Sequence, residues 1–319
     1  MTALHDLTAT ELVARYRDRS LSPVEVTGAV LDRIALWEPH LHATYALDPE
    51  AALATASDSE ARWAKGAPLG AIDGVPSMIK ENIATRGTPT PLGTAATLLA
   101  PAAHDAPPAA RMREAGAVIL GKTTMPDYGM LSSGLSSFHA LTRNPWDLSK
   151  GPGGSSAGAG AGVAAGYGPL HVGTDIGGSV RLPAAWCGIF TLKPSLGRVP
   201  IDPPYAGRVA GPMTRNVADA ALLMSVLAQP DDRDTMSLPA QAMAWSELDC
   251  DVRRLKIGLL IDAGAGLPVD PEIAAAVRAA ADRFAAAGAQ VEAVAPFFTR
   301  AMLDGMDAFW RMRSWLEYA

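Results

Sequence analysis

The sequence predicts an α/β fold, because short apolar runs typical of buried strands alternate with helical stretches. Residues 117–120 (AVIL), 170–173 (LHVG) and 255–261 (LKIGLLI) are the runs that we interpret as buried strands. The clearest unit covers residues 255–294. There a strand is followed by the helix cap Asp270, by Pro271 at the first helical position, by an alanine-rich helix to Ala287 and by a second strand. This order predicts one βαβ crossover with parallel strands.

The two ends of the chain are predicted to be helical. Thr8 with Glu11 three residues later matches a capping box, and Ser22 before Pro23 matches an N-cap followed by proline at the first helical position. Residues 299–318 carry apolar side chains at helical spacing and then stop, with neither a returning strand nor a cap. We therefore expect that the chain is truncated at its C-terminal end.

Size and composition favour a single domain over residues 1–319, since 49% of the residues are hydrophobic and suffice for a large core. The net charge is -6, and acidic and basic residues are mixed along the chain without a basic block. No nucleic acid is therefore expected as a direct partner. No apolar run at the N-terminus resembles a signal peptide and none is long enough to span a bilayer. We expect a cytoplasmic protein without membrane contact.

Two glycine-serine loops, residues 153–158 (GGSSAG) and 173–181 (GTDIGGSVR), place Ser155 and Ser179 24 residues apart. Glycines let backbone N–H groups converge on a developing oxyanion. Lys80 ends an apolar run, and a lysine amine serves as a base only if burial lowers its pKa enough to leave it partly neutral. Each residue alone has an ordinary interpretation: a surface lysine, a helix N-cap at Ser155 and a turn at Ser179. Together they indicate a serine hydrolase that works without histidine.

Other motifs match known functional sites, but the residues around them exclude those functions. Residues 116–123 (GAVILGKT) match a phosphate-binding loop, but the four residues between the glycines are themselves an apolar strand. Residues 154–158 (GSSAG) match a nucleophile elbow, yet His171 is the only later histidine and residues 157–170 contain no acid to complete a triad. The six histidines and the two cysteines, Cys187 and Cys250, form no ligand pattern for a metal. We expect no metal ion and no organic cofactor.

The stretch from about Asp73 to Gly197, and more loosely the whole chain, resembles the amidase signature family. The motifs that carry the resemblance are Gly153-Gly154-Ser155-Ser156, Gly177-Gly178-Ser179, Arg181, Pro183, Cys187-Gly188 and Leu192-Lys193-Pro194. The resemblance implies a mixed central β-sheet with helices on both faces. It also implies that a C-terminal part is missing, because relatives are usually longer and use that part to add strands and to close one side of the substrate pocket.

The resemblance also implies a Lys–cis-Ser–Ser triad. Ser179 would attack an amide carbonyl and pass its proton through Ser155 to neutral Lys80, and the peptide bond Gly154–Ser155 would be cis. The oxyanion would be held by backbone N–H groups, namely those of Ile176, Gly177, Gly178 and Ser179.

Further roles follow from the same resemblance. Met130, Ser155 and Thr174 would contact the substrate, whereas Asp175, Arg181 and Ser156 would support the loops. One position departs from many relatives, because Glu81 follows Lys80 where they carry aspartate.

The function implied is hydrolysis of a linear carboxylic amide to a carboxylate and ammonia or an amine, with a small-molecule amide as the partner. Two alternatives stay open. One is the glutaminase subunit of a tRNA-dependent amidotransferase, and the other is a truncated and inactive amidase-like protein. The residues leave the oligomeric state open, with a homodimer as one option.

Overall fold

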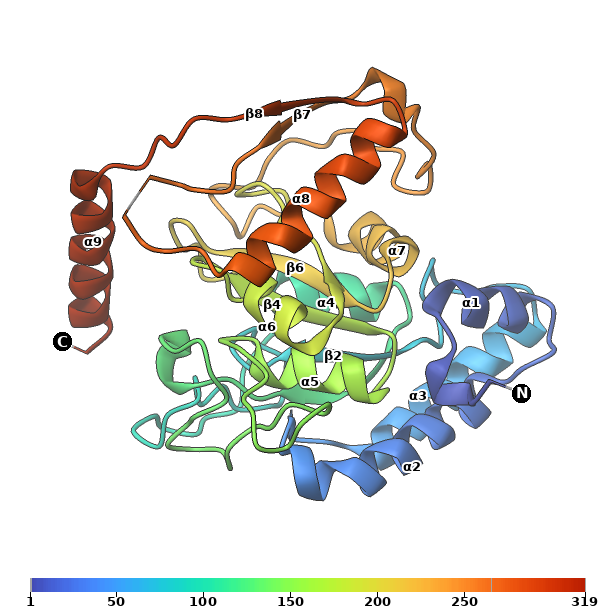
Figure 1. Cartoon of the computed structure of the whole chain (residues 1–319). Helices are drawn as coiled ribbons and strands as arrows, with labels where there is room; N and C mark the ends of the chain where they lie inside the picture. The colour runs from blue at the N-terminus through green and yellow to red at the C-terminus, as the bar shows by residue number, and fades with distance from the viewer. Residues whose placement is uncertain (1, 265, 319) are drawn as a thin grey trace. The chain divides into compact units, whose positions relative to one another are not determined.

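The computed structural model describes residues 2–264 and 266–318, and this part of the chain divides into two compact units, Met1–Ser246 and Glu247–Ala319. We call them unit 1 and unit 2; their elements are labelled in Figure 1. Whether the two units form the single domain expected for residues 1–319 stays a prediction.

Unit 1 contains a six-stranded sheet in the order β1-β3-β2-β4-β6-β5. Its strands are β1 (Thr44–Tyr45), β2 (Pro76–Lys80), β3 (Val118–Thr123), β4 (Leu170–Asp175), β5 (Phe190–Thr191) and β6 (Val209–Thr214). β2 is parallel to both β3 and β4, whereas β1, β5 and β6 run antiparallel to their neighbours. The predicted mixed central sheet is therefore confirmed.

Helices cover both faces of this sheet. The helices of unit 1 are α1 (Ala9–Arg17), α2 (Pro23–Leu41), α3 (Pro49–Ala64), α4 (Pro107–Glu114), α5 (Ala157–Ala165), α6 (Arg181–Cys187) and α7 (Val217–Leu227), with short 3-10 turns η1 (Leu4–Asp6) and η2 (Asp127–Gly129). Every residue of β2, β4 and β6 is buried. Since successive side chains of a strand point to opposite faces, such continuous burial requires cover on both sides.

The predicted helix starts of unit 1 are confirmed. Thr8 and Glu11 form the reciprocal bonds of a capping box at α1, and Ser22 caps α2 with Pro23 at its first position. These local signals depend only on residues a few positions apart, which explains why the sequence alone predicts them.

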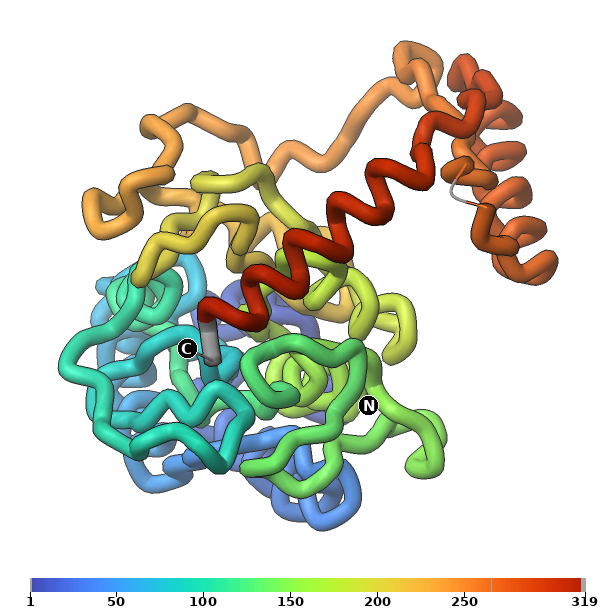
Figure 2. Tube along the Cα trace, turned by 90° about the vertical axis from the view of Figure 1, so that its left-hand side faces the viewer, coloured from blue at the N-terminus to red at the C-terminus, as the bar shows by residue number. Residues whose placement is uncertain are grey.

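The long segments that follow the carboxyl ends of β2 and β3 gather on one side of unit 1. They lie at the left of Figure 1 and face the viewer in Figure 2, where they are teal and green. In open α/β sheets, ligand sites form at the carboxyl ends of parallel strands. This side is therefore where a functional site is expected.

Unit 2 contains the predicted βαβ crossover. It comprises η3 (Val252–Arg254), β7 (Lys256–Leu259), α8 (Pro271–Ala286), β8 (Gln290–Ala293) and α9 (Arg300–Tyr318). β7 and β8 are parallel and Asp270 caps α8, as predicted for the crossover. The expected burial of the first strand is wrong, because residues of β7 alternate between exposed and half-buried. A two-stranded sheet with one crossover helix leaves much of its surface open.

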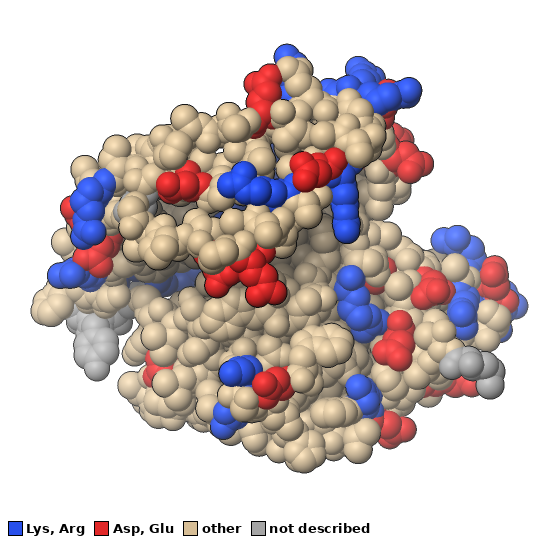
Figure 3. Space-filling view, in the orientation of Figure 1, with Lys and Arg blue, Asp and Glu red and all other residues tan. Residues whose placement is uncertain are grey.

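The charged side chains on the face drawn in Figure 3 are interspersed, with blue and red groups separated by larger uncharged areas. Among the helices of the described residues, none is both long and apolar enough to cross a membrane.

Candidate active site

Lys80 is the last residue of β2 and is completely buried. Its Nζ donates hydrogen bonds to Ser155 Oγ at 2.8 Å and to Thr174 Oγ1 at 3.0 Å. Thr174 belongs to β4, the strand that lies beside β2. Burial disfavours the charged form of an amine, so the sheet holds Lys80 in surroundings that suit a base.

Ser155 lies just before α5, and its side chain is almost fully buried. The peptide bond Gly154–Ser155 is cis, as predicted. A Cβ atom at Gly154 would lie 2.5 Å from the backbone nitrogen of Ser133 and 2.6 Å from its oxygen, so the close approach of these segments requires glycine. This packing holds the hydroxyl of Ser155 beside Lys80.

Ser156 joins the two glycine-serine loops. Its backbone N–H donates to the carbonyl oxygen of Ser179 at 3.1 Å. Its hydroxyl donates to the carbonyl oxygen of Thr174 at 3.2 Å and accepts from the N–H of Thr174 at 3.3 Å. The segment that carries Ser155 is thus bonded to both ends of the segment that carries Ser179.

Asp175 organises the second loop from inside. Its buried carboxylate accepts from the N–H groups of Gly178 at 2.8 Å and Val180 at 3.1 Å, and from both Nε and Nη2 of Arg181. Burial alone raises the pKa of Asp175, but the hydrogen bonds from Arg181 and the two backbone groups outweigh it and hold the pKa below its ordinary value. Asp175 and Arg181 therefore occupy the loop-bracing positions that the sequence predicts.

The four N–H groups of the predicted oxyanion hole differ in their hydrogen bonds, and their role stays a prediction. The N–H of Gly178 is already bonded to Asp175, because that carboxylate lies under the loop. Among the described residues, the N–H groups of Ile176, Gly177 and Ser179 have no backbone or side-chain acceptor. These three groups stay candidates for binding an oxyanion.

Ser179 is half-buried. No hydrogen bond between described residues joins its hydroxyl to that of Ser155, so the proton relay between the two serines stays a prediction. Met130 is half-buried and follows η2, next to Gly129. A Cβ atom at Gly129 would lie 3.1 Å from Ser155 Oγ, which places Met130 in the neighbourhood of the site. Its contact with a substrate stays a prediction.

Sequence reasoning missed Asn82, whose Nδ2 donates to Thr174 Oγ1 at 3.0 Å. Asn82 lies in the turn that follows β2, where the N–H of Ile83 donates to the carbonyl of Lys80 at 3.0 Å, and this turn brings its side chain to Thr174. It also missed the hydrogen bond between the side chains of Glu81, the residue after Lys80, and His139. That pair joins residues 58 positions apart, which no local pattern connects.

The motifs rejected from the sequence have structural roles. The four residues between the glycines of the phosphate-loop pattern lie in β3 or next to it. The amine of Lys122 is buried and donates to the carbonyl of Ile83 at 2.9 Å; burial lowers its pKa to about 8. Burial also raises the pKa of the Cys187 thiol to about 12, which fits an inert core cysteine. Within the described residues, no group of three His, Cys, Asp or Glu side chains is arranged to hold a metal ion.

Known proteins are similar to this chain over most of its length. The family model described as Amidase matches residues 25–310. One subunit of the glutamyl-tRNA(Gln) amidotransferase of Chromohalobacter salexigens is 42% identical over 298 residues, which are 90% of this chain and 60% of that protein. An acylamidase of Rhodococcus erythropolis is 37% identical over 299 residues, 92% of this chain and 62% of that protein. The chain thus spans about 60% of the length of these curated relatives.

Solved structures agree with the fold. A bacterial aryl acylamidase of the amidase signature family superposes with a TM-score of 0.86 at 35% identity, covering 95% of this chain and 64% of that one. The peptide amidase of Stenotrophomonas maltophilia gives a TM-score of 0.82 at 34% identity, with 91% and 62% covered.

Proposed function

Because this chain belongs to the amidase signature family, we propose that it hydrolyses a carboxylic amide through an acyl-enzyme on Ser179. The observation that carries the proposal is the buried hydrogen bond of 2.8 Å between Lys80 Nζ and Ser155 Oγ. A lysine without bulk water beside a buried serine is the arrangement that base catalysis without histidine requires.

In the acylation step the Ser179 hydroxyl oxygen attacks the amide carbonyl carbon. Its proton moves to the hydroxyl of Ser155, whose own proton moves to neutral Lys80. The N–H groups of Ile176, Gly177 and Ser179 would stabilise the oxyanion of the tetrahedral intermediate; losing one such donor costs about 2.7–4 kcal/mol in comparable sites. The proton then returns through Ser155 to the amide nitrogen, and the C–N bond breaks to leave the acyl group on Ser179.

Deacylation repeats the path with water. A water molecule attacks the acyl carbon and gives its proton through Ser155 to Lys80, and the same proton returns to Ser179 as the ester bond breaks. The products are a carboxylate and ammonia or an amine. The proposal requires no metal ion and no organic cofactor.

A small organic amide is the proposed substrate class. It is supported by the names of similar proteins, which are an acylamidase, an aryl acylamidase and a peptide amidase. Each of these names describes an enzyme that acts on an amide bond, and the groups on either side of that bond differ between them. We therefore propose for this chain only the reaction that they share.

A second candidate is the glutaminase reaction of an amidotransferase, favoured by the 42% identity to the protein from C. salexigens. The same triad would release ammonia from glutamine. The two candidates differ in their dependence on a partner: glutaminase activity that requires an added partner protein favours the second, whereas turnover of simple amides by the chain alone favours the first.

Intact-mass labelling with a fluorophosphonate tests the proposal directly. We expect one label per chain for the wild type and for the control Ser149→Ala, which alters an exposed serine. We expect none for Ser179→Ala, and at least a hundredfold slower labelling for Lys80→Met, which removes the amine while keeping the length of the side chain. A folded wild-type chain that takes up no label contradicts the proposal and favours the truncated, inactive alternative. A Ser179→Ala chain that labels normally also contradicts it.

A further inference from the structure

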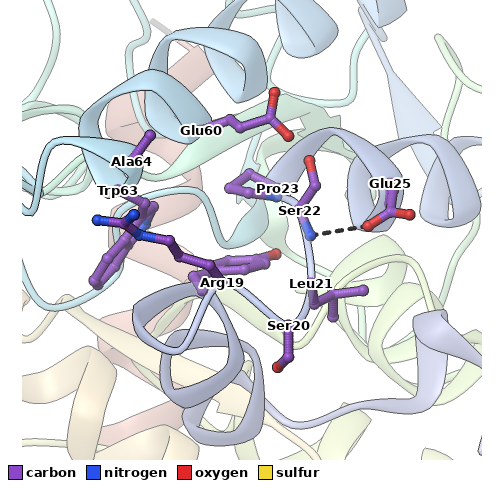
Figure 4. A pocket seen from close by; sticks show the side chains of 10 residues that line it. Arg19, Ser20, Leu21, Ser22, Pro23, Glu25, Glu60, Trp63 and Ala64 are labelled. Carbon is purple, nitrogen blue, oxygen red and sulfur yellow. Dashed lines mark hydrogen bonds between the residues drawn. The ribbon is translucent and has the colours of Figure 1, made fainter.

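Unit 1 contains a pocket that shares no residue with the candidate active site. It has a volume of about 220 Å³ and lies where α1, the start of α2 and the end of α3 meet (Figure 4). This volume is below the roughly 300–1,000 Å³ of pockets for drug-sized ligands, so a smaller molecule is the matching occupant.

Aromatic and apolar side chains line part of this pocket. Tyr16 and Trp63 are only 1% and 7% exposed, and their ring centroids are 6.3 Å apart. The indole N–H of Trp63 already donates to the carbonyl of Asp73 at 3.1 Å, so the ring itself is what Trp63 offers to a ligand. Leu21 and Pro23 extend the apolar lining. Such a surface suits an aromatic or branched aliphatic group.

Two opposite charges border the pocket from different elements. Arg19 projects from the turn after α1, and Glu60 projects from α3 (Figure 4). Among the described residues, neither the guanidinium of Arg19 nor the carboxylate of Glu60 has an ion-pair or hydrogen-bond partner. The third charged residue of the lining, Glu25, is different. Its carboxylate accepts the N–H of Ser22 at 3.0 Å, the dashed line of Figure 4, and so serves the cap of α2.

The backbone keeps Arg19 at this border. Arg19 has a φ of 58°, in the left-handed region that non-glycine residues rarely adopt. Its N–H donates to the carbonyl of Tyr16 at 3.1 Å, and the next N–H, of Ser20, donates to the carbonyl of Arg15 at 3.0 Å. These bonds close the end of α1 and turn the chain toward α2, so that Arg19 lies beside the pocket instead of continuing the helix.

One further group is unsatisfied. The hydroxyl of Tyr16 is buried and has no hydrogen-bond partner within the described part of the chain. A buried donor of this kind is rarely left unpaired in native proteins. Its oxygen is enclosed by protein atoms, so this hydroxyl is not among the groups that a ligand in the pocket contacts.

From these observations we propose that the pocket binds a free α-amino acid with an aromatic or branched aliphatic side chain. The α-carboxylate pairs with Arg19, the α-ammonium pairs with Glu60, and the side chain packs against Leu21 and the accessible part of Trp63. A carboxylate and a guanidinium form the stronger, planar type of charge-assisted bond. The site is independent of the proposed amidase reaction, since none of its residues takes part in that reaction.

Isothermal titration of the full chain with L-phenylalanine tests this site. We expect saturable one-to-one binding that Arg19→Gln and Glu60→Gln each weaken about tenfold, the effect of losing one hydrogen bond to a charged group. Arg17 at the end of α1 and Glu50 in α3 are exposed and lie outside the pocket, so the matched controls Arg17→Gln and Glu50→Gln should bind as the wild type does.

Two fragments of L-phenylalanine test which charged group of the ligand pairs with which residue. 3-Phenylpropionate lacks the ammonium, and phenethylamine lacks the carboxylate; both should bind the wild type more weakly than L-phenylalanine does. Arg19→Gln should weaken 3-phenylpropionate but not phenethylamine, and Glu60→Gln should do the reverse. No saturable binding of L-phenylalanine at millimolar concentration overturns the proposal. Binding that both pocket substitutions leave unchanged also overturns it, because the amino acid then binds elsewhere on the chain.

Discussion

The hydroxyl of Thr174 is shared by two side chains at the candidate active site. It accepts hydrogen bonds from Lys80 Nζ and from Asn82 Nδ2, each at 3.0 Å. Lys80 also donates to Ser155, so Thr174 and Ser155 together determine where the amine points. We infer that Thr174 and Asn82 are positioning residues, which act on the reaction through Lys80.

Replacing Thr174 by valine removes this hydroxyl with little change of shape. We expect the rate of fluorophosphonate labelling at Ser179 to fall about fivefold, since one such hydrogen bond contributes about 1 kcal/mol net. Thr174→Ser keeps the hydroxyl and should label at nearly the wild-type rate. Equal labelling rates for the valine and serine variants would show that the hydroxyl of Thr174 does not position Lys80 for the reaction.

A second residue-scale prediction concerns pH. His171 is fully buried in β4, and burial lowers its pKa from 6.5 to about 4. Between these values the unfolded chain binds the proton and the folded chain does not, so the free energy of unfolding decreases as the pH falls from about 6.5 to 4. The full effect is about 3 kcal/mol at roughly 1.4 kcal/mol per pKa unit. Urea unfolding of the wild type and of His171→Gln at several pH values measures it. If the free energy of unfolding changes with pH equally in the wild type and in His171→Gln, other groups cause the pH dependence.

At the scale of elements, α5 determines how closely the serine segment approaches the sheet. The helix begins one residue after Ser156 and packs against β2, β3, β4 and β6. A Cβ atom at Gly158 would lie 2.1 Å from the carbonyl oxygen of Ala43 and 2.5 Å from the backbone nitrogen of Thr124. The small residue at Gly158 is therefore a packing requirement of α5.

Two glycine-to-alanine substitutions separate packing from helix propensity. Gly158→Ala should lower the free energy of unfolding by about 2 kcal/mol or more, because the neighbouring atoms belong to the backbone and cannot move aside cheaply. Gly28→Ala lies in α2 with no atom within 4 Å of the new Cβ, and it should raise stability by about 0.5–1 kcal/mol. Chemical denaturation of both variants measures the difference. Similar effects of the two would contradict the close packing of α5.

At the scale of the whole molecule, the two units differ in how much core they contain. All the candidate active-site residues lie in unit 1, where a large cluster of buried hydrophobic side chains surrounds the six-stranded sheet. In the described part of unit 2, the buried residues are Ala281, Ala289 and Arg313. A two-stranded sheet with so few buried side chains is marginal by itself.

Hydrogen exchange measured by mass spectrometry should show this difference. We expect the amides of β2, β4 and β6 to exchange at least about a hundredfold more slowly than those of β7 and β8, because exchange from a small core requires only local opening. Peptides from α5 should follow the slow group and serve as an internal control. Equal protection of the two sheets would mean that they unfold together.

Much of the local structure could be predicted from the sequence, because it depends on neighbours along the chain. The caps at Thr8 and Ser22 are decided by residues three or fewer positions away, and the apolar run 117–120 is enough to exclude a phosphate-binding loop. The glycine-serine motifs indicated Ser155 and Ser179, and the position of Lys80 at the end of an apolar strand made it a candidate base.

What the sequence determined by itself is therefore the identity of the candidate residues, the mixed α/β class and the helix and strand patterns. Only the tertiary structure decided which groups meet. It brings Thr174 and Asn82 to Lys80, pairs Glu81 with His139 and commits the N–H of Gly178 to Asp175. Most of these contacts depend on the order and register of strands and on loops that cross between them, with partners 94 residues apart in one case. Periodicity along a chain specifies which face of a strand is buried, but it carries no information about which strand becomes its neighbour.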